Sequence, residues 1–142
     1  MVRQTVYIFS SQPVILFQSH NGFNLTVVFE KIVSWFRLGL YTDDLSDIPY
    51  FQLMNATYGV KIDHGMVEDL VLTSVIQQGV HKQELDLSFK TGDRLNITLA
   101  NNQLVMTKNK IQIYQDRLAQ KVVAITKTFI QSERGSHFFI TY

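Results

Sequence analysis

The sequence predicts a mostly β protein, an antiparallel sandwich or a partly open barrel, with one packed α-helix over residues 63–78. Two observations predict the sheet. Apolar and polar residues alternate over residues 85–89, 95–99 and 111–114. Turn-forming residues separate these runs, at residues 91–93, 101–102 and 108–110. Because successive side chains of a strand point to opposite faces, such alternation is typical of a half-buried antiparallel sheet.

The composition predicts a single globular domain over residues 1–142. The chain is 46% hydrophobic and 18% charged, and 142 residues are enough to bury a core without covalent cross-links. It contains no cysteine, which excludes disulfides, thiolate catalysis and thiolate metal sites. We find no secretory signal and no apolar run near the roughly 18 residues that span a bilayer. These features predict a soluble protein, cytoplasmic or virion-associated.

Near the start of the chain, residues 5–10 and 14–18 have the composition of strands. The Asn21-Gly22 pair that follows favours a tight hairpin turn, because both residues tolerate a positive φ at low cost. The sequence therefore predicts a hairpin that pairs residues 14–19 with residues 24–29.

Residues 25–40 fit two interpretations. Apolar residues recur here at spacings of three and four, which is typical of an amphipathic helix. However, several of them are β-branched, and the preceding Asn-Gly pair favours a strand. We expect a strand to about residue 29, followed by a helix or a continued strand to residue 40. The alternative fold class is therefore α+β, with a second helix near residues 30–40.

Residues 63–78 show the clearest helical pattern. Asp63 is a suitable N-cap, Glu68 and Asp69 lie in the early turns, and Gly79 can end the helix. An apolar stripe runs along one face of this segment. We expect strands in the remainder of the chain, among them residues 122–129 and a last strand over residues 137–142.

No residue cluster identifies a reaction. The chain has no phosphate-binding glycine motif and no nucleophile elbow, and no two of its four histidines are three or four residues apart. We therefore predict no cofactor, no metal and no catalytic residue. A small enzyme remains the weakest alternative, with His64 or His81 and nearby carboxylates as its catalytic groups.

Charge is distributed unevenly along the chain. Residues 40–70 contain six acidic residues and one basic residue, a net charge of −5. Residues 101–142 contain six basic and two acidic residues, a net charge of +4. Opposite charge in different segments favours their mutual attraction, within one fold or between subunits. We predict that the acidic group meets the basic group, with two aromatic anchors: Asp43, Asp44 and Asp47 with Lys121, Lys127 and Arg134, and Phe139 and Tyr142.

These observations favour a non-enzymatic structural or protein-interaction subunit, such as a viral or phage virion or assembly component. The terminal strand is either an edge that adds to a neighbouring sheet or a buried closing strand. A nucleic-acid-binding module is the alternative. Its phosphate contacts would come from lysines and its base stacking from aromatic rings: Lys108, Lys110, Lys121 and Lys127, with Tyr114 or Phe129.

Overall fold

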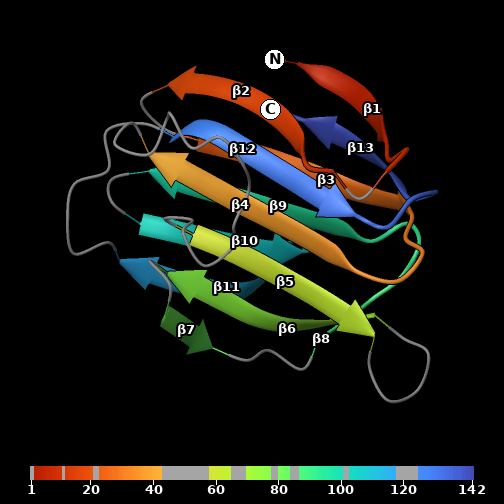
Figure 1. The fold of residues 1–142 in the computed structure, drawn as a ribbon. Helices are drawn as coiled ribbons and strands as arrows, with labels where there is room; N and C mark the ends of the chain where they lie inside the picture. The colour runs from red at the N-terminus through yellow and green to blue at the C-terminus, as the bar shows by residue number, and fades with distance from the viewer. Residues whose placement is uncertain are drawn as a thin grey trace.

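The computed structural model of the protein is a sandwich of two antiparallel β-sheets (Figure 1). It describes residues 2–10, 12–20, 23–42, 58–64, 70–77, 80–83, 87–100, 103–117 and 125–142. The six-stranded sheet contains, in spatial order, β1 (Arg3–Tyr7), β13 (His137–Thr141), β3 (Phe23–Lys31), β9 (Arg94–Ala100), β10 (Gln103–Lys108) and β11 (Ile111–Arg117). The seven-stranded sheet contains β2 (Val14–His20), β12 (Ile125–Ser132), β4 (Phe36–Thr42), β5 (Tyr58–His64), β6 (Leu70–Gln77) and β7 (Val80–Gln83), and β8 (Leu87–Phe89) pairs with β6.

In β9 the alternation in the sequence corresponds directly to burial. In β9, Leu95, Ile97 and Leu99 are buried, whereas Asn96 and Thr98 lie on the outer face and are partly exposed. In a sandwich, a strand with one apolar face buries it against the opposite sheet, so period-two alternation leads to one shared core. The described residues form two antiparallel sheets and are all β, whereas the predicted fold class included a packed helix.

Aromatic side chains from both sheets meet in the middle of the core. The ring of Phe29 in β3 packs edge-on against Phe36 of β4 at 5.1 Å and against Phe89 of β8 at 5.4 Å. It also packs edge-on against Phe138 of β13 at 5.7 Å. Edge-to-face packing is the favoured geometry of aromatic pairs, and it ties four strands of the two sheets together.

The predicted helix over residues 63–78 is wrong. Within the described residues, this segment belongs to β5 and β6, which pair antiparallel from Tyr58 opposite Gln77 to His64 opposite Leu70. β6 pairs with β5, β7 and β8, so it gains main-chain hydrogen bonds from several strands. It is also rich in β-branched residues, which fit a pleated sheet better than a helix. Asp63, predicted as a helix cap, instead lies in β5.

The second helix near residues 30–40 is also wrong. β3 continues to Lys31, and β4 begins at Phe36. The helical spacing arose because two β-strands, each with alternating apolar residues, follow one another after a short connection. The described part of the chain contains no helix.

The Asn-Gly hairpin prediction is wrong as well. β2 pairs with β12 in the seven-stranded sheet, whereas β3 pairs with β13 and β9 in the six-stranded sheet. Asn21 and Gly22 themselves lie outside the described residues. The chain therefore changes sheets between β2 and β3, and turn chemistry alone does not determine which strands pair.

Candidate functional site

A polar cluster lies on the outer face of the seven-stranded sheet, on β4 and β5. Even-numbered residues of these strands, such as Leu38 and Val60, are buried in the core. Odd-numbered residues point the other way, which places Arg37 directly opposite Lys61 in the register. We call Trp35, Arg37, Lys61, Asp63 and Gln131 the polar cluster.

Arg37 organises this cluster. Its Nη2 atom donates to Oδ1 of Asp63 at 2.6 Å, and its Nη1 donates to the carbonyl oxygens of Phe36 and Ile62, both at 2.9 Å. Its guanidinium carbon lies 5.4 Å from the centroid of the Trp35 ring, within the range of a cation–π contact. These contacts hold the planar guanidinium group in one orientation on the sheet.

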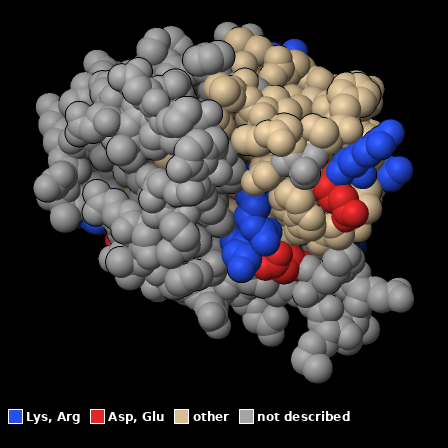
Figure 2. All heavy atoms as spheres, in the orientation of Figure 1, with Lys and Arg blue, Asp and Glu red and all other residues tan. Residues whose placement is uncertain are grey.

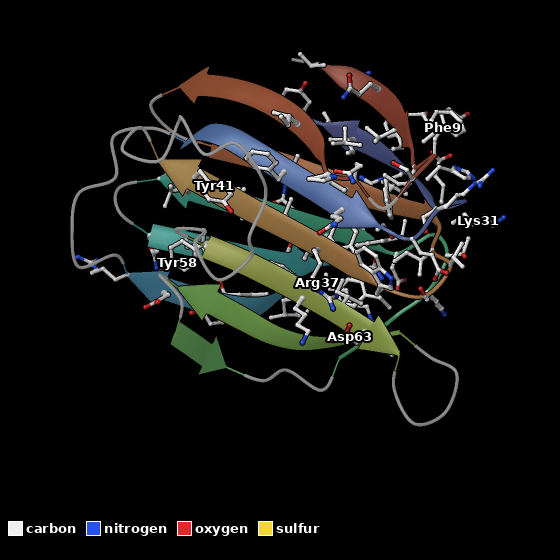
Figure 3. All side chains as sticks on the ribbon, viewed as in Figure 1. Phe9, Lys31, Arg37, Tyr41, Tyr58 and Asp63 are labelled. Carbon is white, nitrogen blue, oxygen red and sulfur yellow. The ribbon has the colours of Figure 1, made fainter. Side chains whose placement is uncertain are left out.

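A second cation completes the charged part of the cluster. Lys61 Nζ lies 3.6 Å from Oδ2 of Asp63, and the side chains of Arg37, Lys61 and Asp63 are between 20% and 37% exposed. Gln131 of β12 is the register neighbour of Arg37 on the other side. Figure 3 labels Arg37 and Asp63 on adjacent strands, and Figure 2 shows basic and acidic atoms side by side at that place. The cluster therefore offers fixed donors and acceptors beside an aromatic ring.

An aromatic group lies on the outer face of the other sheet. Tyr7 is 57% exposed and its ring centroid is 5.4 Å from that of His137 and 6.3 Å from that of Phe9. Phe9 is 81% exposed and Phe139 is 37% exposed. Exposed aromatic side chains gathered in one area are typical of surfaces that contact another molecule.

Two buried tyrosines share one carboxylate between the sheets. The hydroxyl groups of Tyr58 in β5 and Tyr114 in β11 each donate to Oδ2 of Asp116 at 3.3 Å. Burial and the negative charge of Asp116 raise the pKa of Tyr114 to about 12, and the same causes raise the pKa of Tyr58 still further. Both hydroxyls are therefore protonated near neutral pH, so we interpret this group as a structural link between the sheets.

The predicted partner-binding residues fall into two groups. Asp43, Asp44, Asp47 and Lys121 lie outside the described residues, so the contact between the acidic and the basic group stays a prediction. Lys127 lies in β12 and Arg134 is exposed in the turn before β13.

The two predicted aromatic anchors differ in their surroundings. Phe139 points outward, whereas Tyr142 is partly buried and packs against the core. β13 pairs with both β1 and β3, so the terminal strand is internal and cannot add to a neighbouring sheet. The open edge on this side of the sheet belongs to β1.

The structure also bears on the two alternative functions. Tyr114 and Phe129 are 7% and 2% exposed, so neither ring is available to stack on a nucleic-acid base. Lys108 lies 3.7 Å from Oδ2 of Asp93 and is engaged there. His64 lies in β5 and His81 in β7, on strands separated by β6. Among the described residues, no three His, Asp or Glu side chains gather in a way that could bind a metal ion.

The sequence analysis did not predict the polar cluster, although the sequence contains a pattern that indicates it. Residues 36–40 and 58–63 each alternate apolar residues with glycine or charged residues. Read as strands, they place Gly39 opposite Gly59 and Arg37 opposite Lys61. The helix predicted from Asp63 onward hid this pattern.

Comparisons with known proteins identify the fold. No family model matches the sequence, and a search of curated proteins by sequence finds no match. In structure, the chain resembles the TRIM65 PSpry domain, with a TM-score of 0.61 and 13% identity over 94% of this chain and 70% of that one. It also resembles toad ovary galectin in complex with thio-digalactose, with a TM-score of 0.55 and 14% identity over 93% and 98% of the two chains.

A third similar structure is the carbohydrate recognition domain of Emp47p, with a TM-score of 0.51 and 10% identity over 97% and 85% of the two chains. At 10–14% identity, these likenesses show the fold that the chain shares with those proteins. The comparisons do not support a viral or phage assembly role in particular. None of the described residues forms a helix long and apolar enough to cross a membrane. The chain has a β-sandwich fold similar to those of a PSpry domain and a galectin.

Proposed function

We propose that this protein is a non-enzymatic recognition module that binds glycans through the polar cluster on β4 and β5. The observation that carries the proposal is the fixed arrangement of Arg37, Asp63 and Lys61 beside Trp35. Sugar hydroxyls donate and accept hydrogen bonds, so they pair with neighbouring cations and carboxylates held in a defined geometry. An indole ring adds an apolar surface for the C–H face of a sugar ring.

The fold supports this choice of ligand class. Two of the similar structures are a galectin with thio-digalactose and a carbohydrate recognition domain. The polar cluster lies on a sheet face rather than on loops, so strand pairing positions the side chains before any ligand arrives. Because two cations accompany one carboxylate in the charged part of the cluster, we expect a preference for neutral or acidic glycans.

A glycan array with the purified protein tests the proposal, followed by titration of the best ligand and of thio-digalactose. We expect Lys61→Ala and Asp63→Ala to weaken binding by roughly tenfold or more, since each removes a charged partner of sugar hydroxyls. Arg117→Ala is the matched control, because Arg117 is an exposed cation on β11 of the other sheet. Absence of glycan binding, or binding that Lys61→Ala and Asp63→Ala leave unchanged, would show the proposal to be wrong.

A further inference from the structure

The edge strand β1 has the longest uninterrupted ladder among the described sheet edges. The described ladder of β1 with β13 runs in regular register from Arg3 opposite Thr141 to Tyr7 opposite His137. The described pairings of the edge strands β11, β2 and β7 each contain a register shift, and β8, whose ladder with β6 is regular, is only three residues long. Bulges at sheet edges hinder pairing with another chain, and a regular edge leaves it possible. β1 is therefore the edge best suited to add a strand.

The main-chain groups of β1 that face away from β13 can be assigned from the hydrogen bonds. Val2 and Tyr142 exchange both main-chain bonds, at 2.6 and 2.9 Å, and Ile8 donates to the carbonyl of Ser136 at 3.0 Å. In an antiparallel ladder, hydrogen-bonded residue pairs alternate with non-hydrogen-bonded pairs, whose main-chain N–H and C=O groups point away from the partner strand. The N–H and C=O groups of Arg3, Thr5 and Tyr7 therefore point to the open side of β1, which Figure 1 shows as the outermost strand of its sheet.

The side chains along this edge include exposed apolar surface. Val2 and Tyr7 are 45% and 57% exposed, and Phe9, just beyond β1, is 81% exposed. Arg3, Thr5 and Tyr7 all lie on the outer face of the sheet, because they alternate with buried Val6. Figure 3 shows Phe9 at the end of this strand. Water would solvate this surface poorly, whereas an added strand would cover it.

We propose that β1 pairs antiparallel with β1 of a second copy of this chain, about a two-fold axis at Thr5. In this register, Thr5 faces Thr5 of the second copy, and Arg3 faces Tyr7 of the second copy. All three outward-facing residues then exchange main-chain hydrogen bonds, about six bonds in total. The pairing closes as a two-fold dimer and extends the six-stranded sheet across both subunits.

This register is self-complementary in its side chains. Arg3 of each copy meets the ring of Tyr7 of the other, a cation–π pair, and no like charges oppose one another. Thr5 with Thr5 is a favourable β-branched cross-strand pair. On the inner side of the same strands, the exposed Val2 comes opposite Ile8 of the second copy. An unrelated extended peptide would share the main-chain bonds but not this reciprocal match, so the second copy is the favoured partner.

The inference is independent of the proposed glycan site, because β1 and the polar cluster lie on different sheets. A ladder of five residues is short. We therefore expect a dimer that dissociates on dilution. Light scattering or native mass spectrometry over roughly 1 to 500 µM protein would show a rise from monomer to dimer mass.

Two substitutions at Thr5 provide a matched comparison. Thr5→Pro removes the outward N–H at the two-fold axis and leaves the bonds to β13 intact, so we expect dimerisation to weaken roughly tenfold or more. Thr5→Val keeps the main chain and a β-branched side chain, so we expect the dimer to persist. Circular dichroism and the melting temperature establish whether each variant remains folded.

A cross-linking experiment checks the register even if the proline variant fails to fold. The chain contains no cysteine, so a single Thr5→Cys substitution introduces the only thiol. Opposed residues in a hydrogen-bonded pair have Cα atoms about 5.5 Å apart, within disulfide range. We expect mild oxidation to give a covalent dimer with Thr5→Cys but not with Gln115→Cys, an exposed position on the other edge of the sheet. A monomer at all concentrations, or equal cross-linking at both positions, would overturn the inference.

Discussion

Asn109 donates a hydrogen bond from its Nδ2 atom to Oδ1 of Asp93 at 3.0 Å, and so joins two turns at one end of the six-stranded sheet. Its Oδ1 atom accepts from the main-chain N–H of Arg94 at 2.9 Å. Asp93, which is 4% exposed, also accepts from the N–H of Lys90 at 2.9 Å. The two side chains therefore hold the start of β9 against the turn between β10 and β11.

Removal of the Asp93 carboxylate is expected to destabilise the protein. Asp93→Ala leaves the N–H of Lys90 and the amide of Asn109 without their acceptor, and Lys108 without its ion-pair partner. We expect the free energy of unfolding to fall by about 2–4 kcal/mol, measured by urea denaturation. Glu30→Ala is the control, because Glu30 is an exposed carboxylate whose loss should change stability by less than about 1 kcal/mol. Equal effects of the two substitutions would contradict the role assigned to Asp93.

Lys110→Gly is expected to stabilise the protein. Asn109 and Lys110 have φ values of 50° and 72° and form the two-residue connection between the paired residues Lys108 and Ile111. A type I′ turn of this kind favours glycine at its second position, since a Cβ atom is strained at positive φ.

We expect Lys110→Gly to raise the free energy of unfolding by about 0.5–1 kcal/mol in thermal or urea denaturation. Gln112→Gly, two residues later in β11, provides the contrast. There glycine should lower stability, because it weakens an extended strand that needs no positive φ. A loss of stability in both variants would mean that Lys110 is not strained.

The tyrosine pair around Asp116 predicts a loss of stability at alkaline pH. The folded state raises the pKa of Tyr114 to about 12 and that of Tyr58 further still, whereas an unfolded tyrosine loses its proton near its ordinary pKa of 10.0. Above this value the folded state binds more protons than the unfolded state, so stability falls as pH rises. The stability contributed by the two protonated tyrosines is fully present below pH 10 and is lost as the pH rises through about 12. Denaturation curves at several alkaline pH values, with phenolate absorbance in parallel, measure this decline.

The double variant Tyr58→Phe, Tyr114→Phe is the control for this pH dependence. It removes both titrating hydroxyls and should flatten the curve above pH 10. Asp116→Asn should act in the same direction more weakly, because it removes the negative charge that helps to raise both pKa values. An unchanged slope in the double variant would assign the alkaline transition to other groups.

Truncation of the Phe29 side chain is expected to lower the stability of the protein strongly. Its side chain is fully buried and contacts the rings of Phe36, Phe89 and Phe138. We expect Phe29→Ala to lower the free energy of unfolding by about 3–5 kcal/mol, since it leaves a cavity between the two sheets. Phe9→Ala removes the same group from an 81% exposed position and should change monomer stability by about 0.5 kcal/mol or less. Similar losses for both variants would contradict the packing described here.

The fold was predictable from the sequence where strands are bounded by turns. The run at β9 stands between turn residues and alternates strictly, and its burial alternates in the same way. In β11 the agreement is only partial, because Ile111 is 71% exposed and the ladder with β10 contains a register shift. The prediction failed at β6, where apolar residues also recur at helical spacing. Pairing with β5, β7 and β8 decides its conformation, and such contacts cannot be derived from one segment alone.

The candidate site was less predictable than the fold. Arg37 and Lys61 are far apart in the sequence and become neighbours through the register of β4 and β5. Trp35 joins them because the chain turns into β4 immediately after it. A charged residue within an apolar run indicates an outer face, but its neighbours across the strands depend on which strands pair and in what register.

By itself, the sequence determined that this protein is built from antiparallel strands with a packed core, because side-chain alternation is a local property that every strand carries. The tertiary structure alone decided that β2 and β3 belong to different sheets, that β13 is internal and that β1 forms a regular edge. Those outcomes depend on long-range hydrogen bonds and on the common burial of apolar faces. Residues distant in the sequence satisfy these requirements together, and no short segment contains the information that selects its partners.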